Sequence, residues 1–269
     1  MSPKKSKSKK KPKSKKRIMH IGDNLIVPSA YHEAGHAVLN VCFGLELGSI
    51  GVMIDGAGCG ICGTKHIKPN AKEIYTRAQS LDKKTINPIS IIFKLIREVR
   101  GVEGFVIWHD YITRYEKIVI SNCAGRQSEW YYGFGRFKVS KAINLVDEFF
   151  DIKNSGSYEK MLEGDNIEVS DDLSSLYYLA DLYAARKNIG HLSKLTEEDE
   201  KMIIKYFLEL EKETFIFIKN KNIWGIIHDL AMVLLEKKHV TSEYVYDKVE
   251  KYLDKNPLSQ NILSRIHQR

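Results

Sequence analysis

The sequence predicts an α+β fold that is mainly helical and carries one small β-sheet. Most apolar residues recur at helical spacing, whereas the stretch Gly48–Ile67 has two β-rich runs around a cluster of glycines and predicts a hairpin. The chain has 269 residues, 43% of them hydrophobic, which is long enough to bury a substantial core. We expect one folded domain at 18–255, between an N-terminal tail at 1–17 and a C-terminal tail at 256–269.

The formal charge of +8 is concentrated in the N-terminal tail. Residues 1–17 hold ten Lys or Arg and no acid, and the rest of the chain has 32 basic against 34 acidic side chains. The tail lacks the apolar surface that would offset ordering entropy, so we expect it to be disordered. Ten cations attract polyanions, which makes nucleic acid a candidate partner of the tail. A solubilising or targeting extension is the alternative.

Neither a secretory signal nor a membrane span is visible in the sequence. The tail has no apolar core segment, and no later run approaches the roughly 18 apolar residues that cross a bilayer. We therefore expect a soluble, cytoplasmic protein. Four scattered cysteines are too few for a disulfide framework and predict reduced thiols: Cys42, Cys59, Cys62 and Cys123.

The first half of the folded domain contains two predicted helices with the hairpin between them. Alanines and valines at helical intervals predict a buried helix over 28–43, with Pro28 in its first turn and Gly44 at its end. After the hairpin and a mixed stretch, a second helix is predicted from Tyr115 to Tyr132.

Helices predominate in the second half. One begins after Ser170, a candidate N-cap, and a long one begins at a capping-box-like pair, Thr196 and Asp199. Two more are predicted over 223–238 and 242–253. The buried stripe of the helix after Ser170 is predicted to comprise Leu173, Leu176, Tyr177, Ala180, Tyr183 and Ala184.

The helix over 28–43 carries the pattern HExxH. His32 and His36 lie about 40° apart around the helix axis, and Glu33 lies about 100° from His32, so all three share one face. One helical turn separates the imidazoles as a tetrahedral Zn²⁺ requires, while the glutamate can act as a general base. Two histidines and a carboxylate buried without partners would cost several kcal/mol, which argues against a merely structural role.

A catalytic Zn²⁺ usually takes three protein ligands, so a third must come from elsewhere in the chain. Spacing alone does not identify it. By side-chain chemistry the candidates include Glu129, Asp165, Asp171, Asp172, His109 and His191.

Four stretches resemble, in order, the peptidase domain of the FtsH family of zinc metallopeptidases. "AYHEAGHAV" resembles the family's zinc signature, and "AGRQSEWYYG" resembles its Gly-Arg-x-Ala-Glu helix. "SDDLSSLYYLADL" resembles its Ser-Asn-Asp helix, and "LLEKKHVTSEYV" resembles its penultimate helix and the following turn. The resemblance spans about residues 28–250 and is dense at these four stretches.

The resemblance implies roles for two further residues. Asp172 matches the aspartate that is the family's third zinc ligand, and its position one turn before Leu176 on the buried stripe agrees with this role. Glu129 matches the glutamate of the second motif and is expected to be an outer-shell partner of the metal, with direct ligation as the alternative. The hairpin corresponds in order to the strand that borders the family's active-site cleft, where an extended peptide could pair with a strand edge.

The sequence therefore predicts an ATP-independent zinc metallopeptidase, with insertions near 86–115 and 138–165 relative to the family. The family's ATPase module and membrane anchors are not present in this sequence, and the spacing from His32 to Asp172 is longer than typical. Expected substrates are proteins or peptides with loops, tails or unfolded segments, and an oligomer is compatible with the resemblance. The alternatives are a zinc-stabilised interaction domain without protease activity and a nucleic-acid-associated protein that acts through its basic tail.

Overall fold

The computed structural model describes most of the predicted helices and the hairpin, namely residues 26–54, 60–65, 102–135 and 194–267 and parts of 175–187. The predicted tail at 1–17 and the predicted insertion at 138–165 lie outside the described residues. So does Asp172, the expected third ligand.

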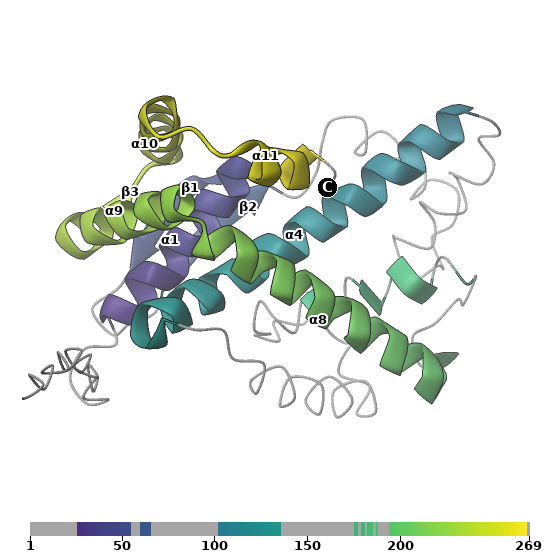
Figure 1. The fold of residues 1–269 in the computed structure, drawn as a ribbon. Helices are drawn as coiled ribbons and strands as arrows, with labels where there is room; N and C mark the ends of the chain where they lie inside the picture. The colour runs from purple at the N-terminus through teal and green to yellow at the C-terminus, as the bar shows by residue number, and fades with distance from the viewer. Residues whose placement is uncertain are drawn as a thin grey trace, which may run out of the picture.

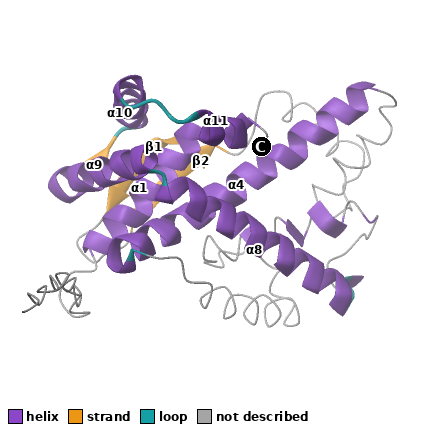
Figure 2. Ribbon diagram, in the orientation of Figure 1, coloured by secondary structure: helices purple, strands orange, loops and turns teal. Residues whose placement is uncertain are grey.

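Helix α1, Ile26–Cys42, lies at the centre of a mainly helical fold that also contains a small sheet. It packs against helix α4 (Val102–Phe134), helix α9 (Lys221–Lys237) and two strands of the sheet, as Figure 1 shows. Figure 2 shows the strands beside α1, among helices that make up most of the described chain. The predicted α+β class, mainly helical, is confirmed.

The helix predicted over 28–43 is confirmed as α1, within two residues at each end. Pro28 lies in its first turn, and the helix ends where Gly44 adopts a left-handed conformation, with φ of 67°. The amide of Leu45 then donates to the Asn40 carbonyl at 2.8 Å, which satisfies a carbonyl that the end of the helix exposes. Every residue from Ala30 to Asn40 except His32 is buried, because α4, α9 and the sheet cover the helix.

The predicted hairpin is confirmed, and the structure adds a third strand. Strand β1 (Glu46–Ile54) pairs antiparallel with β2 (Gly60–Lys65), with a register irregularity between Leu47 and Val52. On its other edge β1 pairs with β3, His239–Val240. Sequence periodicity does not detect a two-residue strand, because two residues show no alternation.

Helix α4 begins thirteen residues before the predicted start at Tyr115 and extends to Phe134. The region 86–115, expected to be an insertion, therefore contributes the first turns of this helix. At the crossing with α1, a Cβ on Gly35 would lie 2.6 Å from the Ala124 carbonyl oxygen and would collide with the Ser128 hydroxyl. Glycine at this position lets the two backbones approach closely.

Four helices of the C-terminal region follow one another around this pair. They are α8 (Glu197–Lys219), α9, α10 (Ser242–Lys255) and α11 (Gln260–His267). The predictions over 223–238 and 242–253 are confirmed within a few residues. The expected C-terminal tail at 256–269 instead contains α11.

Helix α11 is connected to α8 by an ion pair, and two of its isoleucines are buried in the core. Ile262 and Ile266 are buried, and the Arg265 guanidinium donates to both carboxylate oxygens of Glu213 at 2.9 Å. Only two apolar residues of this short segment are buried, too few for a helical period to be evident in the sequence.

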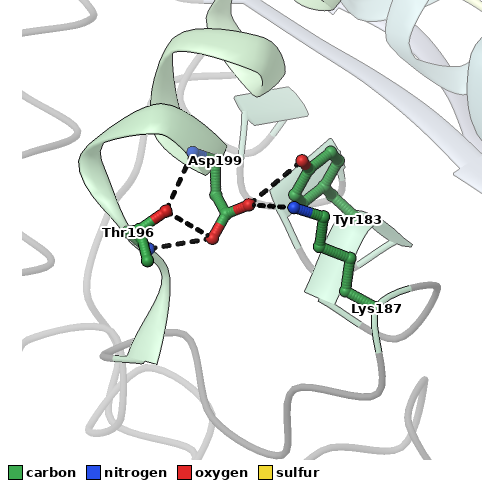
Figure 3. A network of polar contacts seen from close by, with 4 residues as sticks. All are labelled: Tyr183, Lys187, Thr196 and Asp199. Carbon is green, nitrogen blue, oxygen red and sulfur yellow. Dashed lines mark hydrogen bonds and ion pairs between the residues drawn. The ribbon is translucent and has the colours of Figure 1, made fainter.

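The capping box predicted at the start of α8 is confirmed. The Asp199 amide donates to the Thr196 hydroxyl, and the Asp199 carboxylate accepts from the Thr196 amide at 3.0 Å. The same carboxylate accepts from Lys187 at 2.6 Å and from the Tyr183 hydroxyl at 3.1 Å, as Figure 3 shows. These contacts connect α8 to the helical residues before it, in which Leu176 and Ala180 of the predicted stripe are buried.

The contact network around Asp199 should make part of the folding stability depend on pH. The hydrogen bond from Lys187, followed by that from the Thr196 amide, holds the pKa of Asp199 well below its usual range. A carboxyl group whose pKa is lowered by folding stabilises the fold above its unfolded pKa of about 4, and this stabilisation is lost as the pH falls toward the folded pKa.

We expect Asp199→Asn to lower the free energy of unfolding at neutral pH by about 1 kcal/mol or more. The difference from wild type should narrow as the pH falls below about 4, in urea-unfolding curves recorded over that range. Glu198→Gln is the control, because Glu198 lies on the same first turn but is exposed. A difference between wild type and Asp199→Asn that did not change with pH would contradict this account.

Candidate metal centre

The HExxH residues lie on the part of α1 that faces α4. His36 and Glu33 are almost fully buried, with 5% and 6% of their surface exposed, while the His32 side chain is 30% exposed. The two imidazole rings lie edge to face, with their centroids 4.7 Å apart. One turn of a buried helix thus brings both rings to the interface between α1 and α4.

A backbone carbonyl of α4 determines which nitrogen of His36 carries the proton. His36 Nδ1 lies 2.7 Å from the carbonyl oxygen of Ser121. A carbonyl oxygen can only accept, so Nδ1 donates this hydrogen bond, and Nε2 carries the lone pair of the neutral ring. This is the tautomer in which a histidine binds a metal through Nε2.

A carboxylate of α4 lies beside the corresponding nitrogen, Nδ1, of His32. His32 Nδ1 lies 3.6 Å from Glu129 Oε2, and Glu129 is on the turn of α4 that follows Ser128. This distance is longer than a hydrogen bond. The structure therefore places Glu129 beside Nδ1 of His32, which is the side that an outer-shell partner of a metal ligand occupies.

The Nε2 atoms of both histidines converge over Gly125 of α4. A Cβ on this glycine would lie 2.7 Å from His32 Nε2 and closer still to His36 Nε2. Two Nε2 atoms close to one position, with an oxygen acceptor beside each Nδ1, are compatible with two histidine ligands of a tetrahedral metal. The residues present therefore fit Zn²⁺ as far as the first two ligands are concerned.

The described residues do not supply the third ligand. No group of three or more His, Cys, Asp or Glu side chains that could hold a metal occurs among them. Glu129, a candidate by chemistry, lies on the Nδ1 side of His32. The other candidates are outside the described part of the chain or, for His109 on α4, have a side chain that is not described: Asp165, Asp171, Asp172, His109 and His191.

A buried polar cluster attaches the site's second helix to α8. Arg126, next to Gly125, forms an ion pair with Glu211, and the Gln127 side chain donates to the same carboxylate oxygen at 2.9 Å. All three side chains are buried. Breaking one contact of such a cluster leaves a buried charge without its partner, which costs free energy. The cluster therefore restricts how α4 can shift against α8.

An aromatic cluster attaches the start of the motif to α9. Tyr31, the residue before His32, is 1% exposed and its hydroxyl hydrogen-bonds to His228 Nδ1 at 2.5 Å. Its ring stacks on Tyr132 of α4, with centroids 4.0 Å apart, and on Trp224 of α9. These contacts anchor α1 at the turn that carries the first histidine.

The sequence motifs do not mark Ser121 or Gly125 as part of the site. Ser121, Ala124, Gly125 and Ser128 recur at helical spacing along α4, and this stripe of small residues was the available signal for a close helix contact. The motif "AGRQSEWYYG" contains the glycine, but its spacing alone does not show that two imidazoles from another helix lie over it.

Comparison of the chain with protein-family models, with curated proteins and with solved structures finds no match in any of the three. The resemblance to FtsH peptidases therefore depends on the motifs themselves. Within the ranges that the structure describes, no helix is long and apolar enough to cross a membrane.

Gly125→Ala tests the position of the two histidines. Alanine inside a helix is ordinarily about 1 kcal/mol more favourable than glycine. Here we expect a loss of about 1–3 kcal/mol in the unfolding free energy of the metal-free protein, because the added methyl group would overlap both Nε2 atoms. Urea-unfolding curves of wild type and Gly125→Ala measure whether the substitution lowers or raises the unfolding free energy. A neutral or stabilising effect would contradict the placement of His32 and His36 over this glycine.

Proposed function

We propose that this protein is a zinc metallopeptidase of the FtsH type. The observation that carries the proposal is the convergence of His32 Nε2 and His36 Nε2 over Gly125, with each Nδ1 directed at an acceptor on α4. Core histidines with a purely structural role have no need to bring both Nε2 atoms to one position beside a glycine. The four sequence motifs that resemble FtsH peptidases support the same proposal.

The proposed ligands are His32, His36 and Asp172. A Zn²⁺ ion bound by them would polarise the scissile carbonyl and make water a stronger nucleophile near neutral pH. The Ser121 carbonyl holds the His36 imidazole in the tautomer that ligation requires, and Glu129 lies beside Nδ1 of His32 as an outer-shell partner would.

Glu33 is the proposed general base. It directly follows His32 on α1 and is 6% exposed, so it is a buried carboxylate on the same turn of helix as the first histidine. There it accepts the proton of the attacking water and delivers it to the leaving amine. Three of the neighbouring residues of α1 are small and buried, namely Ala34, Gly35 and Ala37.

Glu33→Gln separates metal binding from catalysis. We expect zinc content to be unchanged and cleavage of casein to fall by about 10²–10⁴-fold, because Gln keeps the shape of the side chain but cannot accept the proton. Zinc is measured by elemental analysis and cleavage with fluorescent casein, with and without a chelator. Glu243→Gln, which removes an exposed carboxylate on the first turn of α10, is the control and should change neither.

Retained cleavage in Glu33→Gln would contradict the assignment of the base. Zinc binding by a wild-type protein that does not cleave casein would instead favour the zinc-stabilised interaction domain.

Asp172→Ala and Asp171→Ala test the third ligand as a matched pair. Both substitutions remove one carboxylate from adjacent positions of the same segment. We expect Asp172→Ala to lose most of its zinc and Asp171→Ala to retain it, because only the former would remove a ligand. Equal zinc in wild type and Asp172→Ala, measured on purified protein, would show that another residue completes the site.

A further inference from the structure

We propose that Ser121 and Asn40 are positioning residues for His36, and that they raise metal affinity by holding this ligand against α4. The inference rests on the proposed metallopeptidase function and extends it to two residues that contact the histidine and would not contact the metal. Ser121 is on α4 and Asn40 is on α1, one turn after His36.

Two hydrogen bonds link the three residues in a row: one joins His36 to Ser121, and the other joins Ser121 to Asn40. The carbonyl of Ser121 accepts from His36 Nδ1 at 2.7 Å. The hydroxyl of Ser121 lies 2.7 Å from Asn40 Oδ1 and 3.3 Å from the His36 carbonyl, and its single proton is donated along the shorter contact, to Asn40. Ser121 is thus held from both sides by α1, through a ring and an amide one turn apart.

A third contact orients the Asn40 amide. Its Nδ2 donates to Cys62 Sγ on β2 at 3.9 Å, so Oδ1 is the atom that faces Ser121. Asn40, Ser121 and His36 are 1%, 2% and 5% exposed. Competing water is therefore scarce, and a polar group that lost its partner here would be left without compensation.

The consequence for the metal site is geometric. With the Ser121 turn fixed against Asn40, its carbonyl stays within hydrogen-bond distance of His36 Nδ1, and Nε2 stays directed over Gly125. Without the hydroxyl, this carbonyl can shift, and His36 loses orientation and its preference for the Nδ1–H tautomer. Removal of a direct partner of a metal ligand changes metal affinity by about 10–100-fold. Ser121→Ala keeps the carbonyl that bonds His36 and only loosens it, so its effect should lie at the lower end of this range.

Ser128 provides a matched control on the same helix. It is buried against Gly35 of α1 and, within the part of the chain that the structure describes, its hydroxyl has no hydrogen-bond partner. Ser121→Ala and Ser128→Ala therefore remove the same atom from the same helix interface, and only the first removes a bond connected to His36.

The experiment is a Co²⁺ titration of the metal-free, full-length protein, followed by the visible absorption bands of the bound ion. We expect Ser121→Ala to bind Co²⁺ about 10-fold more weakly than wild type and Ser128→Ala to bind it as wild type does. Thermal unfolding of the metal-free variants measures any purely structural effect separately. Asn40→Ala is the second variant, and it should also bind Co²⁺ more weakly than wild type.

The double variant Asn40→Ala, Ser121→Ala tests whether the two residues act through one bond. If they do, its loss of affinity is no larger than that of the weaker-binding single variant. Wild-type affinity in both single variants would overturn the positioning role and leave the metallopeptidase proposal standing. A wild-type protein that binds neither Co²⁺ nor Zn²⁺ would overturn both.

Discussion

The close contact between α1 and α4 is the constraint on which the candidate site depends. Side chains are absent at two points of this contact, Gly35 on α1 and Gly125 on α4, and a Cβ at either would collide with the opposite helix. Because the backbones approach so closely, a main-chain carbonyl of α4 can reach the His36 ring, and Glu129 can reach His32. The same approach places both Nε2 atoms over one glycine.

The contacts around this helix pair explain how it can keep such a geometry. Arg126 and Gln127 connect α4 to the buried Glu211 of α8, while Tyr31 connects α1 to α9 by a hydrogen bond and by stacking. Ligands supported by packed helices and buried hydrogen bonds are held more precisely than ligands on loops. The proposed roles of His32 and His36 therefore depend on contacts made by residues that have no chemical part in the reaction.

Local sequence signals predicted most elements whose information lies within a few residues. The helix ending at Gly44, the hairpin and the capping box of Thr196 and Asp199 all depend on neighbouring residues, and all three are confirmed. The start of α4, strand β3 and helix α11 were missed. Their apolar residues are too few or too mixed for a clear period, and β3 exists because β1 offers it an edge.

By itself, the sequence determined the kind of site: two histidines one helical turn apart, with a glutamate between them, because the helical repeat follows directly from spacing. Only the tertiary structure decided the direction of the rings. The partners of Nδ1 come from a helix about ninety residues away, and no local pattern encodes which carbonyl, carboxylate or glycine packing brings to a given imidazole. The tautomer of His36 and the convergence over Gly125 are properties of the folded helix pair.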